Sequence, residues 1–192
     1  EKLTKSSYGS VKLAALRSLY HLGDTKALLP IFDMAKNNDL LAIALLGELP
    51  GGEEILAEHL DSPNIQVRLN ATLSLLFRRD SRCIKTLYEF LISDSKDIGY
   101  HPTSSIGHSL MSWKAVPSLR QHQKQLAMDL SGITLQLREQ MLAGTLELPE
   151  EEFLSVASRI FDYKQLELVP LLVQLLENHA TPAALRLLKK NA

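Results

Sequence analysis

The side chains that could act as nucleophiles or metal ligands are few and widely separated. Cys83 is the one cysteine among 192 residues, so it can form neither an internal disulfide nor a thiolate metal site. It lies four residues before Leu87, a spacing that places both on one helix face, and we expect an ordinary core cysteine. The six histidines include no HxxxH or HExxH pair, and His101 and His108 fix no ligand geometry. The sequence therefore predicts no catalytic residue, no metal and no cofactor.

Two further motifs could in principle bind anions. The Gly-Gly-Glu-Glu motif at 51–54 could open a helix N-terminus to an anion, but its two glutamates would repel a phosphate and complement the helix dipole instead. Arg78, Arg79 and Arg82 gather at one turn. We interpret them as a solvated turn, and a contact with an anion or an acidic partner is the alternative.

A segment of unusual charge covers residues 98–128, which contain no Asp or Glu. Residues 147–167, by contrast, are rich in acids, and such an asymmetry is a cue to partner binding. Trp113 is either a core residue between helices or an exposed anchor, because Trp, Tyr and Arg dominate binding hot spots. We expect a protein partner, and the acid-free segment favours an acidic one. The candidate partner-binding residues are Tyr100, His101, Trp113, Lys114, Arg120 and Lys124.

The elements that would position these residues are helices. Apolar residues recur at steps of three and four, and no stretch alternates with a period of two, so we predict an all-α chain without a sheet. The first helix is expected to place Val11, Leu19 and Leu22 on its apolar face. An irregular stretch is expected near 93–103. The predicted helices cover about 10–22, 25–36, 40–49, 53–60, 65–77, 81–92, 104–113, 116–130, 133–146, 150–162, 165–178 and 182–190.

Composition and charge narrow the classes of protein further. The chain is leucine-rich and only 6% aromatic, which favours helices over sheets. A net charge of -1 gives no global field for nucleic acid or an anionic membrane, so nucleic acid is not an expected partner. No apolar run approaches the length of a membrane span. The lone cysteine fits a reducing compartment, and we expect a cytoplasmic protein. The chain starts at Glu1 without an initiator methionine, and we expect it to be a fragment of a longer protein.

Two segments resemble a known repeat. Residues 11–24 read VKLAALRSLYHLGD and residues 61–71 read DSPNIQVRLNA, which is similar to the first helix of a HEAT repeat of the short bacterial type found in phycobilisome lyases. Second helices of such repeats often open with an apolar residue and Pro, as at Leu29-Pro30, Val116-Pro117 and Val169-Pro170. Simple alternation along the chain makes 165–178 a first helix, whereas Val169-Pro170 points to a second one.

The resemblance implies an α-solenoid of about five to six stacked antiparallel helix pairs, with about 30–40 residues per pair. We expect one repeat domain over 1–192, with clear repeats at 10–92, an irregular insertion at 93–114 and divergent repeats at 115–192. A repeat specifies a fold better than a function, so no lyase activity is carried over. We expect a non-enzymatic protein–protein interaction scaffold. The alternatives are a HEAT-like DNA-binding protein or DNA glycosylase, and a structural spacer in a longer multi-repeat chain.

Overall fold

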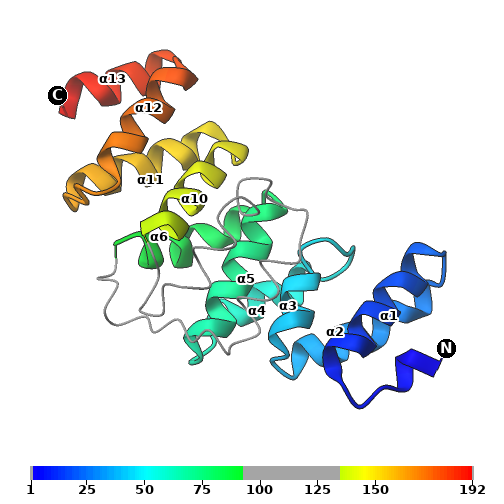
Figure 1. Ribbon diagram of the computed structural model, residues 1–192. Helices are drawn as coiled ribbons and strands as arrows, with labels where there is room; N and C mark the ends of the chain where they lie inside the picture. The colour runs from blue at the N-terminus through cyan, green and yellow to red at the C-terminus, as the bar shows by residue number, and fades with distance from the viewer. Residues whose placement is uncertain (1, 93–134, 192) are drawn as a thin grey trace.

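The computed structural model describes residues 2–92 and 135–191, and within these ranges the fold is all-helical, with ten α-helices and no strand (Figure 1). Short 3-10 turns lead into several helices, at Thr25–Ala27, Ser81–Cys83 and Thr145–Glu147. The α-helices are α1 (Gly9–His21), α2 (Leu28–Lys36), α3 (Leu40–Leu45), α4 (Glu53–His59), α5 (Ile65–Phe77), α6 (Ile84–Ile92), α10 (Leu135–Gly144), α11 (Glu150–Asp162), α12 (Val169–His179) and α13 (Pro182–Asn191).

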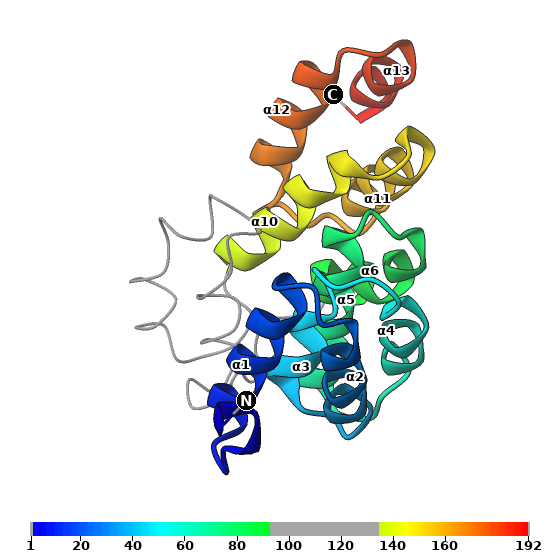
Figure 2. The ribbon, with the colours of Figure 1, turned by 90° about the vertical axis from the view of Figure 1, so that its right-hand side faces the viewer.

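The helices lie in two rows, and each packs against its neighbours in the stack. One row holds α1, α3, α5, α10 and α12, and the other holds α2, α4, α6, α11 and α13 (Figure 2). The packing runs from α1 to α3, α5, α10 and α12 in the first row, and α11 contacts both α6 and α13 in the second. Helix α10 packs on α5 and α6, and α11 packs on α6. The helices before residue 93 and those after residue 134 therefore belong to one stack.

One type of turn closes three of the described helices, α1, α2 and α5. Gly23, Asn38 and Arg79 all adopt a left-handed backbone, with φ of 99°, 62° and 60°, as at the common C-terminal cap of helices. An aspartate follows each of them, and its side chain accepts a backbone N–H two residues later, as Asp24 does from Lys26. The same local chemistry therefore ends one helix and starts the next.

The core runs along the contact between the two rows. Its largest fully buried side chains include Phe90, Phe153 and a series of leucines and isoleucines. Helix α5 lies at its centre, and three of its polar residues, Asn70, Thr72 and Ser74, are buried. Asn70 donates its side-chain amide to Leu40 O at 2.8 Å, and the Ser74 hydroxyl donates to Ile43 O at 3.3 Å. These bonds tie α5 to α3 and pair the Asn70 amide nitrogen and the Ser74 hydroxyl, whereas Asn70 Oδ1 is buried without a partner among the described residues.

Most of the predicted helix ranges agree with the structure within a few residues, but two differ. Helix α3 ends at Leu45 rather than near 49, because a turn containing Pro50 and Gly51, with φ of 78° at the glycine, follows it. The helix predicted from 165 begins at Val169, since Pro170 fits the first helical turn, where its missing N–H costs nothing. The helices predicted at 104–113 and 116–130, and the irregular stretch at 93–103, lie outside the described residues.

The buried face of α1 also differs from the prediction. Leu13 and Leu16 are buried, whereas Val11 and Leu22 are 38% and 83% exposed. Helix α1 stands at the end of the described stack, where it packs against α2, α3 and the 3-10 helix at Lys2–Lys5. Its two inward leucines are therefore sufficient to meet the core. At the other end, α12 packs on α10, α11 and α13.

Candidate functional site

All six residues predicted to bind a partner lie outside the described residues, so their placement stays a prediction. They are Tyr100, His101, Trp113, Lys114, Arg120 and Lys124. The charge asymmetry that singled them out belongs to the sequence alone. Within 2–92 and 135–191, the candidate site residues are the other side chains that the sequence singles out and those that the fold brings together.

Cys83 is fully buried, as predicted. Burial raises the pKa of its thiol to about 12, and the nearby carboxylates of Asp80 and Glu152 act in the same direction. A nucleophilic cysteine needs a depressed pKa and some access to solvent. Near neutral pH the Cys83 thiol stays protonated inside the core, so its chemistry is that of a small apolar residue.

The arginine cluster at 78–82 is occupied by acids of the same chain. Arg79 pairs with Glu147 at 2.6 Å and Arg82 with Glu54 at 2.8 Å, and Arg78 pairs with Glu53. The Gly-Gly-Glu-Glu motif therefore supplies partners for two of the three arginines. The turn is solvated, as interpreted, since the Arg79 and Arg82 side chains are 67% and 41% exposed. It is also a cross-link between the α3–α4 turn, α4 and the α5–α6 turn.

Hydrogen bonds from Arg78 to backbone carbonyl groups strengthen this cross-link. Arg78 Nη1 donates to Leu49 O at 2.9 Å and more distantly to Leu46 O and Gly47 O, which are the carbonyls beyond the end of α3. Partial burial lowers the pKa of Arg78. Asp80 accepts hydrogen bonds from the Arg82 side chain, which lowers the pKa of the aspartate. The cluster thus acts on stability and leaves little free charge for a partner.

Histidines in the described part have contacts with the protein itself. His59 Nε2 lies 2.8 Å from Ala35 O and so joins α4 to α2. His179 stands edge-on to Phe153, with its Nε2 3.9 Å from Glu150 Oε1. No group of three potential metal-binding side chains occurs among the described residues.

A cavity of about 490 Å³ lies at the N-terminal end of the stack, between α1 and the end of α2. Its lining combines Lys12 with Asp33 and the 37–39 turn. Asp39 accepts the backbone N–H groups of residues 41 and 42, and Asn37 donates to Asp33 O at 2.7 Å. Two of these polar groups thus serve the helix ends around the cavity, which suits a structural role better than a binding one.

Helices α6 and α11 bring together an aromatic and basic cluster, formed by Tyr88, Arg159 and Tyr163. The Arg159 guanidinium carbon lies over the Tyr88 ring, 4.6 Å from its centroid. Tyr163 follows α11 and meets Tyr88 edge-on, with the centroids 5.7 Å apart and the planes at 80°. Tyr88 is 7% exposed, whereas Tyr163 is 59% exposed and the neighbouring Leu166 is 75% exposed. The Tyr88–Arg159–Tyr163 cluster therefore has a buried base and an exposed rim.

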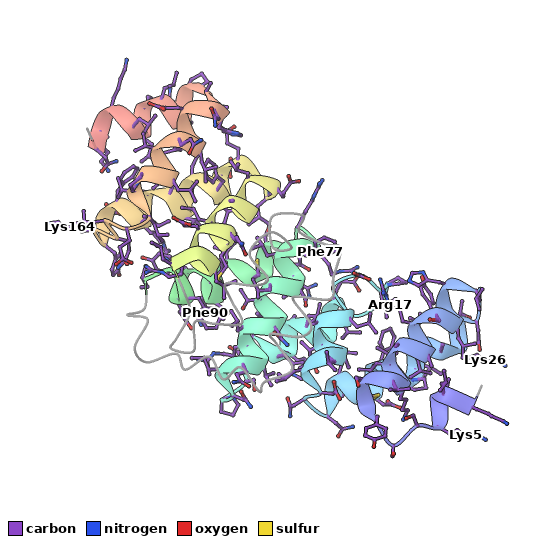
Figure 3. The ribbon with its side chains drawn as sticks, in the orientation of Figure 1. Lys5, Arg17, Lys26, Phe77, Phe90 and Lys164 are labelled. Carbon is purple, nitrogen blue, oxygen red and sulfur yellow. The ribbon has the colours of Figure 1, made fainter. Side chains whose placement is uncertain are left out.

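The polar groups of this cluster are not all paired by the described residues. Arg159 forms no ion pair with any residue that the structure describes, and the Tyr88 hydroxyl is buried without a hydrogen-bond partner there. Burial raises the pKa of Tyr88, and the adjacent Tyr163 phenol adds to this shift. Lys164, which has a left-handed backbone with φ of 52°, projects from the same edge of the molecule (Figure 3). This arrangement can donate hydrogen bonds and offer aromatic surface to a ligand.

Sequence reasoning missed the Tyr88–Arg159–Tyr163 cluster. Residues 147–167 are rich in acids, and the single arginine among them, Arg159, gives no distinct signal of its own. The useful signal was weaker: an arginine and a tyrosine one helical turn apart, near the end of an amphipathic helix. Only the packing of α11 on α6 adds Tyr88 to them.

Comparison of the chain with protein-family models, with curated proteins and with solved structures found no match. The helices that the structure describes include none that is long and apolar enough to cross a membrane. The functional argument therefore rests on the chain's own residues.

Proposed function

We propose that the chain is a non-enzymatic protein–protein interaction scaffold, built as a HEAT-like α-solenoid of about five to six helix pairs. The solenoid is supported by the two rows of helices, in which contacts join neighbours along the stack, and by the turn that recurs after α1, α2 and α5. Stacked pairs of this kind offer an extended surface whose exposed residues are free to vary.

The observation that carries the scaffold function is the exposed rim of the Tyr88–Arg159–Tyr163 cluster. Tyr and Arg are the residue types most enriched at binding hot spots, and here they sit beside a leucine that is 75% exposed. Such a surface is suited to a protein partner. The acid-free segment around Tyr100, Arg120 and Lys124 adds a second proposed contact, with an acidic partner.

Cross-linking in native lysate, followed by affinity recovery, tests the scaffold function. Combined replacement of Tyr100, Arg120 and Lys124 by alanine should reduce partner recovery without lowering the melting temperature. The matched control replaces the exposed Tyr8, Arg186 and Lys189 by alanine, which removes the same side-chain types elsewhere, and it should recover the partner like the wild type.

Four results would contradict parts of this proposal. Unchanged recovery with the first variant removes the site assignment, and failure to recover any partner with the wild type removes the scaffold. A shift of duplex DNA at low salt and micromolar protein would favour the DNA-binding alternative. For the solenoid, native-state hydrogen exchange should be slowest in α5, which packs against α3, α4, α6 and α10, and uniform protection along the chain would argue against it.

A further inference from the structure

The Arg159 guanidinium packs against an aromatic ring, and its N–H donors form no ion pair with the described residues. It lies over the Tyr88 ring at 4.6 Å from the centroid and has no acidic partner among the described residues. A guanidinium placed over an aromatic ring has five N–H groups, and those that the ring does not engage can bind a carboxylate in a forked geometry. The stacking ring also limits the rotamers of a long side chain, so less freedom is lost when a ligand binds.

The Tyr88 hydroxyl is a second donor at the same place. It belongs to a side chain that is 93% buried, and it has no partner in ordinary hydrogen-bond geometry among the described residues, although the Tyr163 phenol and the Arg159 guanidinium lie close enough to affect its pKa. Its raised pKa keeps the hydroxyl protonated near neutral pH. Tyr163, which packs edge-on against this ring, is 59% exposed. A rotation of the Tyr163 side chain toward solvent is the movement that would open the Tyr88 hydroxyl to a ligand oxygen.

The surroundings favour a ligand with a single negative charge. Asp162 is exposed one helical turn after Arg159, and Lys164 is the nearest exposed cation along the chain. A doubly charged phosphate would meet repulsion from the aspartate, whereas one carboxylate is balanced by Arg159. Leu166, exposed on the same connection, offers an apolar contact next to the charge.

We propose that the Tyr88–Arg159–Tyr163 cluster binds a carboxylate group of an acidic, leucine-containing peptide segment in a protein partner. This inference rests on the proposed scaffold function and names the chemistry of its partner at this site. Arg159 supplies the forked contact with the carboxylate, Tyr88 orients Arg159 and donates a further hydrogen bond, and the Tyr163 and Leu166 side chains enclose the apolar neighbours of the acidic residue.

Fluorescence anisotropy with two labelled peptides tests the proposal on the full chain. The probes are Gly-Glu-Leu-Glu-Gly and the neutral counterpart Gly-Gln-Leu-Gln-Gly. The wild type should bind the glutamate peptide about tenfold more tightly, which is what one charge-assisted hydrogen bond provides. Arg159→Gln should abolish this preference. The control Arg186→Gln removes the same charge from an exposed position of α13 and should preserve it.

Two conservative variants examine the hydroxyl groups. Tyr88→Phe keeps the stacking ring and should weaken binding of the glutamate peptide several-fold, because only the buried donor is lost. Tyr163→Phe should have a smaller effect, since this hydroxyl is already exposed to water. Circular dichroism of each variant checks that the helical content is unchanged.

The proposal is overturned if Arg159→Gln retains the preference, or if Arg186→Gln loses it to the same extent, which would indicate general charge attraction. Tighter binding of a phosphoserine counterpart of the glutamate peptide would replace the carboxylate with a phosphate ligand. If partners cross-link to the wild type but the peptide preference is missing, this inference fails alone. If the peptide preference is present and no partner is recovered, the scaffold proposal fails alone.

Discussion

Replacement of Arg138 by methionine tests the junction across which the described stack continues. Arg138 belongs to α10 and is 5% exposed. Its Nε donates to Leu91 O at 3.1 Å, Nη2 donates to the same carbonyl and, at 2.7 Å, to Gln165 Oε1, and Nη1 is 3.3 Å from Glu167 Oε2. One side chain therefore ties α10 to the end of α6 and to the α11–α12 connection. Methionine keeps the unbranched stem and removes every donor.

The expected loss of stability follows from what each acceptor retains. The Leu91 carbonyl is left without these buried donors, which costs about 1–3 kcal/mol. Gln165 keeps its own hydrogen bond to Ile92 O, so loss of its hydrogen bond with Arg138 reduces the free energy of unfolding by less. The Glu167 side chain is 67% exposed, and its ion pair with Arg138 contributes about 0–1 kcal/mol because water screens it. We expect Arg138→Met to lower the free energy of unfolding by about 2–4 kcal/mol.

Urea unfolding monitored by circular dichroism measures this change. Arg186→Met is the control, because Arg186 is exposed on α13, and it should stay within about 0.5 kcal/mol of the wild type. Arg138→Lys should fall between the two, since an ammonium group can reach only part of the acceptor set. A free energy of unfolding for Arg138→Met that matches the Arg186 control would refute the reasoning that this arginine clamps α6, α10 and the α11–α12 connection.

Three further predictions concern the α5–α6 turn and its surroundings. Arg79→Gly should raise the free energy of unfolding in urea by about 0.5–1 kcal/mol, because φ of 60° strains a residue with a Cβ and the exposed Arg79–Glu147 pair contributes little; a loss of stability would show that the ion pair matters more than the backbone. The pKa of the Cys83 thiol is near its ordinary value of 9.0 when the chain is unfolded and is raised to about 12 by burial when it is folded. The wild type should therefore lose stability relative to Cys83→Ala as the pH rises above about 9, by about 1.4 kcal/mol per pH unit, and a constant difference between urea curves at about pH 8 and about pH 10 would contradict this. Hydrogen bonds from Arg82 lower the folded pKa of Asp80, so its contribution is complete above the ordinary pKa of 3.8 and disappears as the pH falls through the lower folded value. Asp80→Asn should thus be less stable than the wild type at neutral pH, and the difference should shrink in acid, whereas an equal difference at both pH values would exclude the charge as its cause.

The helices could be predicted from the sequence because burial and turn chemistry both leave local signals. The range of α5 follows from Asn64, whose side chain accepts the Gln66 N–H at its start, and from the apolar period of three and four. The range of α11 follows from Pro149 and the three glutamates of its first turn. The Cys83 prediction is confirmed for the same reason, since one helical period fixes which side of α6 faces the core.

The buried face of α1 and the end of α3 were harder to predict, because each depends on more than a local period. Helix α1 has two competing stripes of apolar residues, and the neighbours of a helix at the end of the stack decide that Leu13 and Leu16 rather than Val11 are buried. The turn after α3 is held by Arg78, far along the chain, which donates to Leu49 O. Long-range hydrogen bonds of this kind leave no periodic trace.

The Tyr88–Arg159–Tyr163 cluster was not predictable for a deeper reason. Its residues come from α6 and α11, on opposite sides of residues 93–134, and their proximity depends on the direct packing of α11 on α6. In a stacked helical array the core positions obey a period that the sequence reveals, whereas the outward positions are free of it. Binding residues in such a fold are therefore set by which helices become neighbours. Once that order of packing is known, an exposed arginine without a carboxylate partner among its neighbours indicates a binding residue more specifically than the composition of any single segment does.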